Sequence, residues 1–129
     1  MIGSRHGPPA WLHKAFVAYV LFMLLLFLVP VPTGPLDRAT HLDKVIHFSI
    51  FLAFALFWHL DSASGAARTL LAALLFAGAI EVLQGLLPYR DSDWWDLAAG
   101  AAGGVVGAAV VLWRAQQGRP EFGRDDRGD

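Results

Sequence analysis

Four apolar runs dominate the sequence, and each is long enough to cross a membrane as a helix. They extend from Trp11 to about Val31, from Lys44 to Leu60, from Arg68 to about Leu87, and from about Trp94 to Trp113. A helix of about 20 residues spans the hydrocarbon core of a bilayer. The chain is 56% hydrophobic with a mean hydropathy of +0.49, which is too apolar for an ordinary soluble domain. We therefore predict an all-α bundle of four transmembrane helices.

Polar and proline-rich segments separate the runs. Residues 30–35 (PVPTGP) end the first run, a tight polar turn begins at Asp61, and Pro88 stops the third run. We predict a membrane domain over residues 11–113, between a flexible tail (1–10) and a charged, disordered tail (114–129). A cleaved signal peptide is a rival interpretation of the first run. The run is long and no small-residue cleavage site follows it, so we expect an uncleaved anchor.

Lysine and arginine counts predict the orientation of the bundle. Four spans place both termini on one side of the membrane. The two tails, with the turn between the second and third runs, hold seven basic residues, and the other two loops hold three. Because basic residues favour the cytoplasmic side, we predict cytoplasmic termini and a multi-pass protein of the cell membrane. Tryptophans lie at the predicted helix ends, where indoles favour the membrane interface: Trp11, Trp58, Trp94, Trp95 and Trp113.

Composition also excludes several classes of function. The chain has no cysteine, so disulfides, thiolate zinc sites and cysteine nucleophiles are excluded. Its net charge is −1, so no strong overall field attracts nucleic acid, and we predict no nucleic-acid partner.

The predicted topology gathers polar residues at one membrane face, the extracytoplasmic one. The second run starts there, the third ends there and the fourth starts there. The residues brought together are Asp43, Lys44, His47, Glu81, Gln84, Arg90, Asp93 and Asp96. Asp43 and His47 are four residues apart, so they share a helix face. Glu81 and Gln84, three residues apart, share another.

Glu81 is the most informative of these residues. It lies seven positions before Pro88, which is roughly 10 Å below the helix end at 1.5 Å per residue. An acid at that depth needs a partner, bound water or a proton. We predict Glu81 and His47 as acid/base groups and the other polar residues as substrate ligands. We expect His47, Glu81 and Arg90 to approach one another, with Asp43 and Asp96 bordering the same cavity.

The fourth run carries two interleaved pairs of glycines at helical spacing, Gly100 with Gly104 and Gly103 with Gly107. Small residues at this spacing let helix backbones approach closely. We predict that this face packs against a neighbouring helix.

Several of these motifs together resemble the VanZ-like family of small membrane proteins. They are Asp43-Lys-Val-Ile-His47-Phe48, Glu81-x-x-Gln84, Pro88-x-Arg90 and Asp96-x-x-x-Gly100-x-x-Gly103. The resemblance covers most of residues 12–113. The family usually has asparagine four residues after the aspartate that corresponds to Asp96, and this chain has Gly100 there. The resemblance implies a small helical membrane protein, and the founding member is associated with low-level resistance to the glycopeptide teicoplanin.

Two classes of function remain open. The first is an enzyme or binding protein whose partners are membrane lipids or a lipid-linked cell-wall precursor. The second is a structural or accessory protein whose polar residues hold the helices together. A metal site built from His47, Asp43, Glu81 and Asp96 has suitable ligand types, but the spacing matches no short metal motif. We predict no metal and no cofactor. The sequence leaves catalysis and oligomeric state undetermined.

Overall fold

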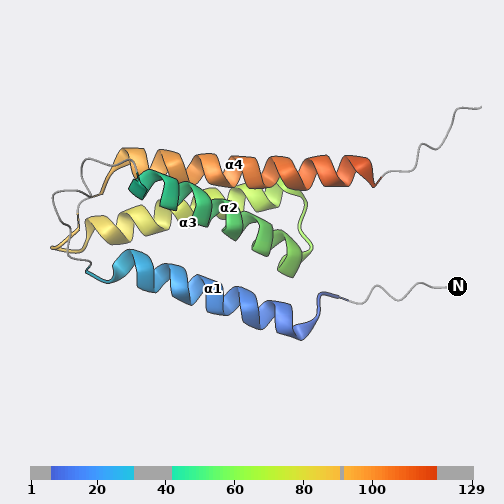
Figure 1. Ribbon diagram of the computed structural model, residues 1–129, viewed down its shortest axis with the longest axis horizontal. Coiled ribbons are helices and arrows are strands. Elements are labelled where there is room, and N and C mark those ends of the chain that lie inside the picture. The colour runs from blue at the N-terminus through green and yellow to red at the C-terminus, as the bar shows by residue number, and fades with distance from the viewer. Residues whose placement is uncertain (1–6, 31–41, 91, 119–129) are drawn as a thin grey trace, which may run out of the picture.

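The computed structural model describes residues 7–30, 42–90 and 92–118, and this part of the chain forms four helices and no strand. The helices are α1 (Ala10–Leu28), α2 (Leu42–Ser62), α3 (Ala66–Gly85) and α4 (Trp94–Gln117). They run side by side and alternate in direction, so that α1 starts and α4 ends at the same end of the bundle (Figure 1). Each is long and apolar enough to span a membrane. The predicted all-α class with four such helices is confirmed.

The helix ends differ from the predicted ones for local reasons. α1 stops at Leu28 because Val29 precedes Pro30 and is extended, with φ −74° and ψ 135°. α2 continues through Asp61 to Ser62, which shortens the expected polar turn. α4 continues past Trp113 to Gln117 because residues 114–117 favour helix and Gly118 is the first residue that does not. Residues 1–6 and 119–129 of the predicted tails lie outside the described residues.

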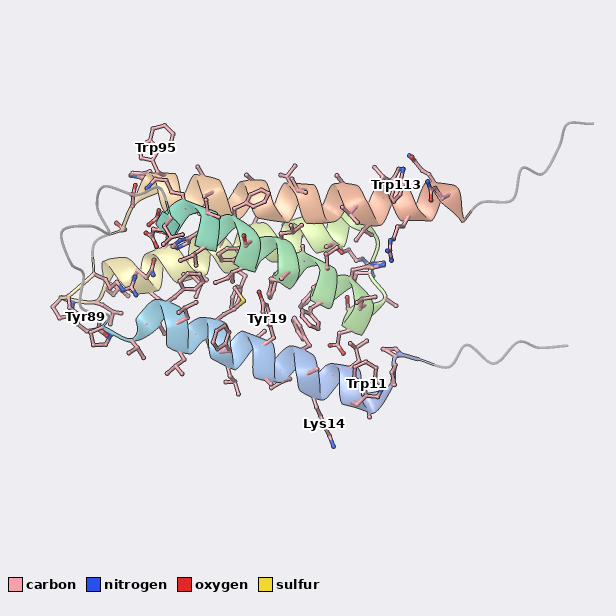
Figure 2. The ribbon with its side chains drawn as sticks, in the orientation of Figure 1. Trp11, Lys14, Tyr19, Tyr89, Trp95 and Trp113 are labelled. Atoms are coloured by element: carbon pink, nitrogen blue, oxygen red, sulfur yellow. The ribbon has the colours of Figure 1, made fainter. Side chains whose placement is uncertain are left out.

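Aromatic side chains fill the contacts among α1, α2 and α3. Phe54 of α2 stacks on Phe76 of α3, with ring centroids 4.7 Å apart. Phe16 of α1 lies against Phe54, and Phe27 of α1 stacks on Phe51. Tyr19, between α1 and α2, donates a hydrogen bond of 2.7 Å to the Ile50 carbonyl (Figure 2). α1 packs on α2 and α3, and these two helices separate it from α4 (Figure 1).

Trp58 packs against other aromatic rings near the end of α2. It is partly buried and lies against Phe16 and Phe54, at centroid distances of 6.0 and 6.2 Å. Phe54 and Trp58 are four residues apart, so the face of α2 that carries Phe54 turns Trp58 towards α1 as well. Trp11 and Trp113 are exposed at one end of the bundle and Trp95 is exposed at the other (Figure 2), which matches positions at two membrane interfaces.

Glycines bring the backbone of α4 into contact with α2. A β-carbon on Gly103 would overlap the backbone carbonyl oxygen of Phe48. One on Gly107 would lie 2.5 Å from Ala55 Cβ, and one on Gly100 would lie 2.8 Å from the Phe51 ring. Gly104 faces α3 instead, where a β-carbon would lie 2.8 Å from Ala73 Cβ. α4 is therefore held between α2 and α3 at distances that only glycine permits.

We expect Gly103→Ala to destabilise the protein by about 1–3 kcal/mol, the usual cost of overpacking, because the new methyl group meets backbone that cannot rotate away. The matched control is Gly78→Ala in α3, where a β-carbon has no described atom within 4 Å. Alanine favours helix over glycine, so this control should be neutral or more stable by up to about 1 kcal/mol. Thermal unfolding in detergent measures both. Equal melting temperatures for the two variants would contradict close packing at Gly103.

Candidate functional site

A group of charged residues lies at the end of the bundle where α1 and α3 end and α2 and α4 begin. We call it the polar cluster: Asp43, Lys44, His47, Glu81, Asp93 and Asp96. Three of its members are buried, with exposed fractions of 1% for His47, 8% for Glu81 and 8% for Asp96. Burying ionisable groups in an apolar bundle is costly unless they find partners. Their partners therefore indicate what the cluster can do.

The first turn of α4 is tied to the first turn of α2. Asp93 caps α4, because its side chain accepts a hydrogen bond of 2.9 Å from the Trp95 backbone N–H. This cap starts the helix so that Asp96 turns inward. Lys44 Nζ then lies 3.4 Å from an Asp93 carboxylate oxygen and 3.5 Å from one of Asp96. The glycine contacts between α2 and α4 bring the starts of these two helices close enough for Lys44 to contact both carboxylates.

His47 lies one turn further into α2 and is held on two sides. Its Nδ1 is 3.0 Å from the backbone carbonyl oxygen of Asp43 and 3.6 Å from the Asp43 carboxylate. Its ring stacks on Phe27 of α1, with centroids 4.6 Å apart. Because a carbonyl only accepts, the hydrogen bond to it requires a proton on Nδ1. Nε2 then carries the lone pair, and within the described residues it has no hydrogen-bond partner.

Glu81 of α3 is buried beside these groups. His47, Asp93 and Asp96 are all close enough to act electrostatically on its carboxylate. One of its oxygens, Oε1, is fully buried and has no hydrogen-bond partner among the residues that the structure describes. A buried acceptor in this state costs about 1–3 kcal/mol, and more if it is charged. Glu81 therefore has capacity for a proton, a water molecule or a ligand.

A pocket of about 320 Å³ adjoins Glu81 between α3 and α4. Its lining is Gly78, Glu81, Val82, Gly85, Ser92, Trp94 and Leu97. Val82 and Trp94 are also exposed on the outside of their helices, so the pocket extends from Glu81 to the outer surface of the bundle. Apart from Glu81 and Ser92, the lining side chains are apolar or absent. The pocket suits a ligand with an apolar body.

Gln84, Tyr89 and Arg90 hold the end of α1. Gln84 Nε2 donates to the Phe27 carbonyl at 3.1 Å, and the Tyr89 hydroxyl donates to the Leu28 carbonyl at 2.7 Å. Arg90 Nη2 lies 3.4 Å from the carbonyl oxygens of Leu26 and Val29. These are the carbonyls that the end of a helix leaves without intrahelical donors, and a cation there also suits the helix dipole. Tyr89 lies beside the end of α1 in Figure 2.

This arrangement changes the predicted site in one respect. Arg90 was expected to approach His47 and Glu81, but its guanidinium points to α1 carbonyls. Gln84 also faces α1. Both residues were predicted to bind substrate, and in the structure both hold the end of α1 instead. Asp43 and Asp96 do lie next to His47. Sequence reasoning missed Tyr89 and Phe27, although three hydrogen-bond donors within residues 84–90, at the end of α3, could have indicated a cap on another helix.

The VanZ/LLP1 family model matches residues 15–115, which include the whole polar cluster. The chain belongs to the VanZ/LLP1 family. No curated protein and no solved structure matched it. The match confirms the resemblance drawn from the motifs, and with the four apolar helices it makes the chain a multi-pass membrane protein.

The polar cluster of this VanZ/LLP1 protein combines three chemical capacities. The Nε2 lone pair of His47 and the free oxygen of Glu81 can accept protons. Lys44 offers a positive charge at the rim, with its side chain 35% exposed. One ligand atom from each of Asp43, His47 and Asp96 lies within 4.8 Å of the others, so these residues can converge on a metal ion.

Proposed function

We propose that this protein is an integral protein of the cell membrane that binds or modifies a lipid or a lipid-linked cell-wall precursor at the polar cluster. One observation carries the proposal. Glu81 lines a mainly apolar pocket, and one oxygen of its carboxylate, Oε1, is buried without a hydrogen-bond partner among the described residues. Such a carboxylate is costly in a purely structural role. It is suitable for a ligand that joins an apolar chain to a hydrogen-bond donor or a cation.

A lipid meets both requirements. Its chain would lie along Val82 and Leu97 in the pocket, and its polar group would reach Glu81. Lys44, which is partly exposed, would attract a phosphate. Glu81 and His47 would exchange protons with the polar group in a modifying reaction, while Asp43, Asp93 and Asp96 would accept hydrogen bonds from it. Through the family resemblance, the proposal also links this protein to resistance to the glycopeptide teicoplanin.

The alternative is a structural or accessory protein without chemistry of its own. The cap on α1 favours it, because Gln84 and Arg90 already serve to hold one helix on another. The ion pair between Lys44 and the start of α4 likewise joins two helices. These contacts leave the unpartnered Oε1 of Glu81 unexplained, and for this reason we place the ligand-binding function first.

The proposal needs the polar cluster on the extracytoplasmic side, as the seven-to-three basic-residue count favours. The chain has no native cysteine, so single cysteines report position cleanly. Ser92→Cys, at the cluster end, should react with a membrane-impermeant thiol reagent in intact cells. Gly118→Cys, after α4, should react only after lysis. The reverse labelling pattern would place the cluster in the cytoplasm and exclude outer-leaflet precursors.

Glu81→Gln tests the function itself. Glutamine keeps the shape of the side chain but neither titrates nor carries charge, and replacing a buried charge by an amide is neutral or stabilising for the fold. We expect an unchanged or raised melting temperature in detergent together with loss of the cellular phenotype, measured as sensitivity to an envelope-targeting antibiotic such as teicoplanin.

The control for this experiment is Tyr19→Phe, which removes one hydrogen bond far from the cluster and costs about 0.5–1.5 kcal/mol. It should lower stability and keep the phenotype. Full cellular activity of Glu81→Gln would reject the ligand-binding function and leave the accessory one. In that case Arg90→Ala should reduce stability and activity together.

A further inference from the structure

We infer that Asp43, His47 and Asp96 form a binding site for one divalent transition-metal ion, of the Mn²⁺ or Zn²⁺ type. The inference goes beyond the proposed function and does not depend on it. It reverses the prediction of no metal, which rested on ligand spacing in the sequence. The three residues come from two helices, so spacing along the chain is not informative about them.

The distances fit a single ion. One ligand atom from each residue lies within 4.8 Å of the other two. Bonds of about 2.0–2.2 Å from nitrogen or carboxylate oxygen to a metal place two ligands of one ion up to roughly 4.4 Å apart. The observed spacing is therefore close to that of a loaded site. Small side-chain rotations would complete it.

His47 gives the second, independent reason. Its ring is 1% exposed, and Nε2 is buried without a hydrogen-bond partner in the part of the chain that the structure describes. A neutral imidazole always carries one nitrogen lone pair, which is the form that binds metal. The stacking on Phe27 and the contact with the Asp43 carbonyl fix the ring orientation. Metal-binding histidines commonly have such a backbone contact on the other ring nitrogen.

The carboxylates give the third reason. One carboxylate oxygen of Asp43 lies within 4.8 Å of one of Asp96. Two carboxylates this close repel unless a proton or a cation lies between them. Lys44 is the described cation beside them, at 3.5 Å from Asp96, and it is shared with Asp93. A divalent ion would neutralise the pair directly and leave Lys44 to Asp93.

The ligand types select the ion. One imidazole and two carboxylates suit Mn²⁺ and Zn²⁺ better than Ca²⁺ or Mg²⁺, which prefer oxygen ligands alone. Three protein ligands also leave coordination positions for water or for an oxygen atom of a bound molecule.

The test uses the full chain, purified in detergent and stripped of metal with a chelator. Titration with Mn²⁺, followed by electron paramagnetic resonance of the free ion, should show one ion bound per chain. His47→Gln and Asp96→Asn should weaken binding at least tenfold. The matched controls are His59→Gln and Asp61→Asn at the other end of α2, and these should bind within twofold of the parent chain.

A second readout keeps the test valid if a buried variant folds poorly. Asp43 is an exposed ligand, with its side chain 53% accessible, so Asp43→Asn should fold and still lose affinity at least tenfold. Mn²⁺ should raise the melting temperature of the parent chain and of both controls, and should raise that of Asp43→Asn clearly less. Absence of stoichiometric binding to the parent chain would overturn the inference. Equal affinity in Asp43→Asn and the parent chain would also overturn it.

Discussion

The backbone contact between α4 and α2 at Gly103 is the constraint on which the site depends. A single methyl group at this position would overlap the Phe48 carbonyl, so the two helices cannot separate or rotate without losing the contact. Two turns earlier in α4, the same approach places Asp96 against the start of α2, beside Lys44 and His47. Lipid supplies no hydrophobic force between helices, and close packing replaces it. The cost of bringing buried charges together is thus offset by apolar contacts outside the site.

A second set of contacts determines where α1 ends and what it covers. Pro30 has no N–H to offer the Leu26 carbonyl, and the extended Val29 ends the helix. The carbonyls of Leu26 to Val29 then accept from Gln84, Tyr89 and Arg90. This cap holds the last turn of α1 in place, and that turn carries Phe27, which stacks on the His47 ring. Pro30 and the turn after α3 therefore both contribute to the orientation of the His47 ring from outside the polar cluster.

The sequence predicts the elements of this structure better than the directions of its side chains. Hydropathy identifies four helices, and helix direction alone brings Asp43, His47, Glu81 and Asp96 to one end. The glycine spacing indicates a packed face on α4. The direction in which each helix face points depends on contacts with other helices. Trp58 turns inward because Phe54, on the same face of α2, packs on α1. Arg90 follows a proline turn, and its direction depends on carbonyls about 60 residues earlier in the chain. The convergence of Asp43, His47 and Asp96 is equally non-local, because it needs the distance between two helices.

We propose that the polar cluster binds a ligand and does more than hold the helices together. An experimental structure of the protein in a lipid bilayer tests it most directly, through the density beside Glu81. We expect a lipid in the pocket between α3 and α4, with a polar atom within about 3.2 Å of the free Glu81 oxygen. A structure in which that oxygen is hydrogen-bonded to the protein itself, with the pocket filled by the protein's own side chains, would rule out a lipid site there.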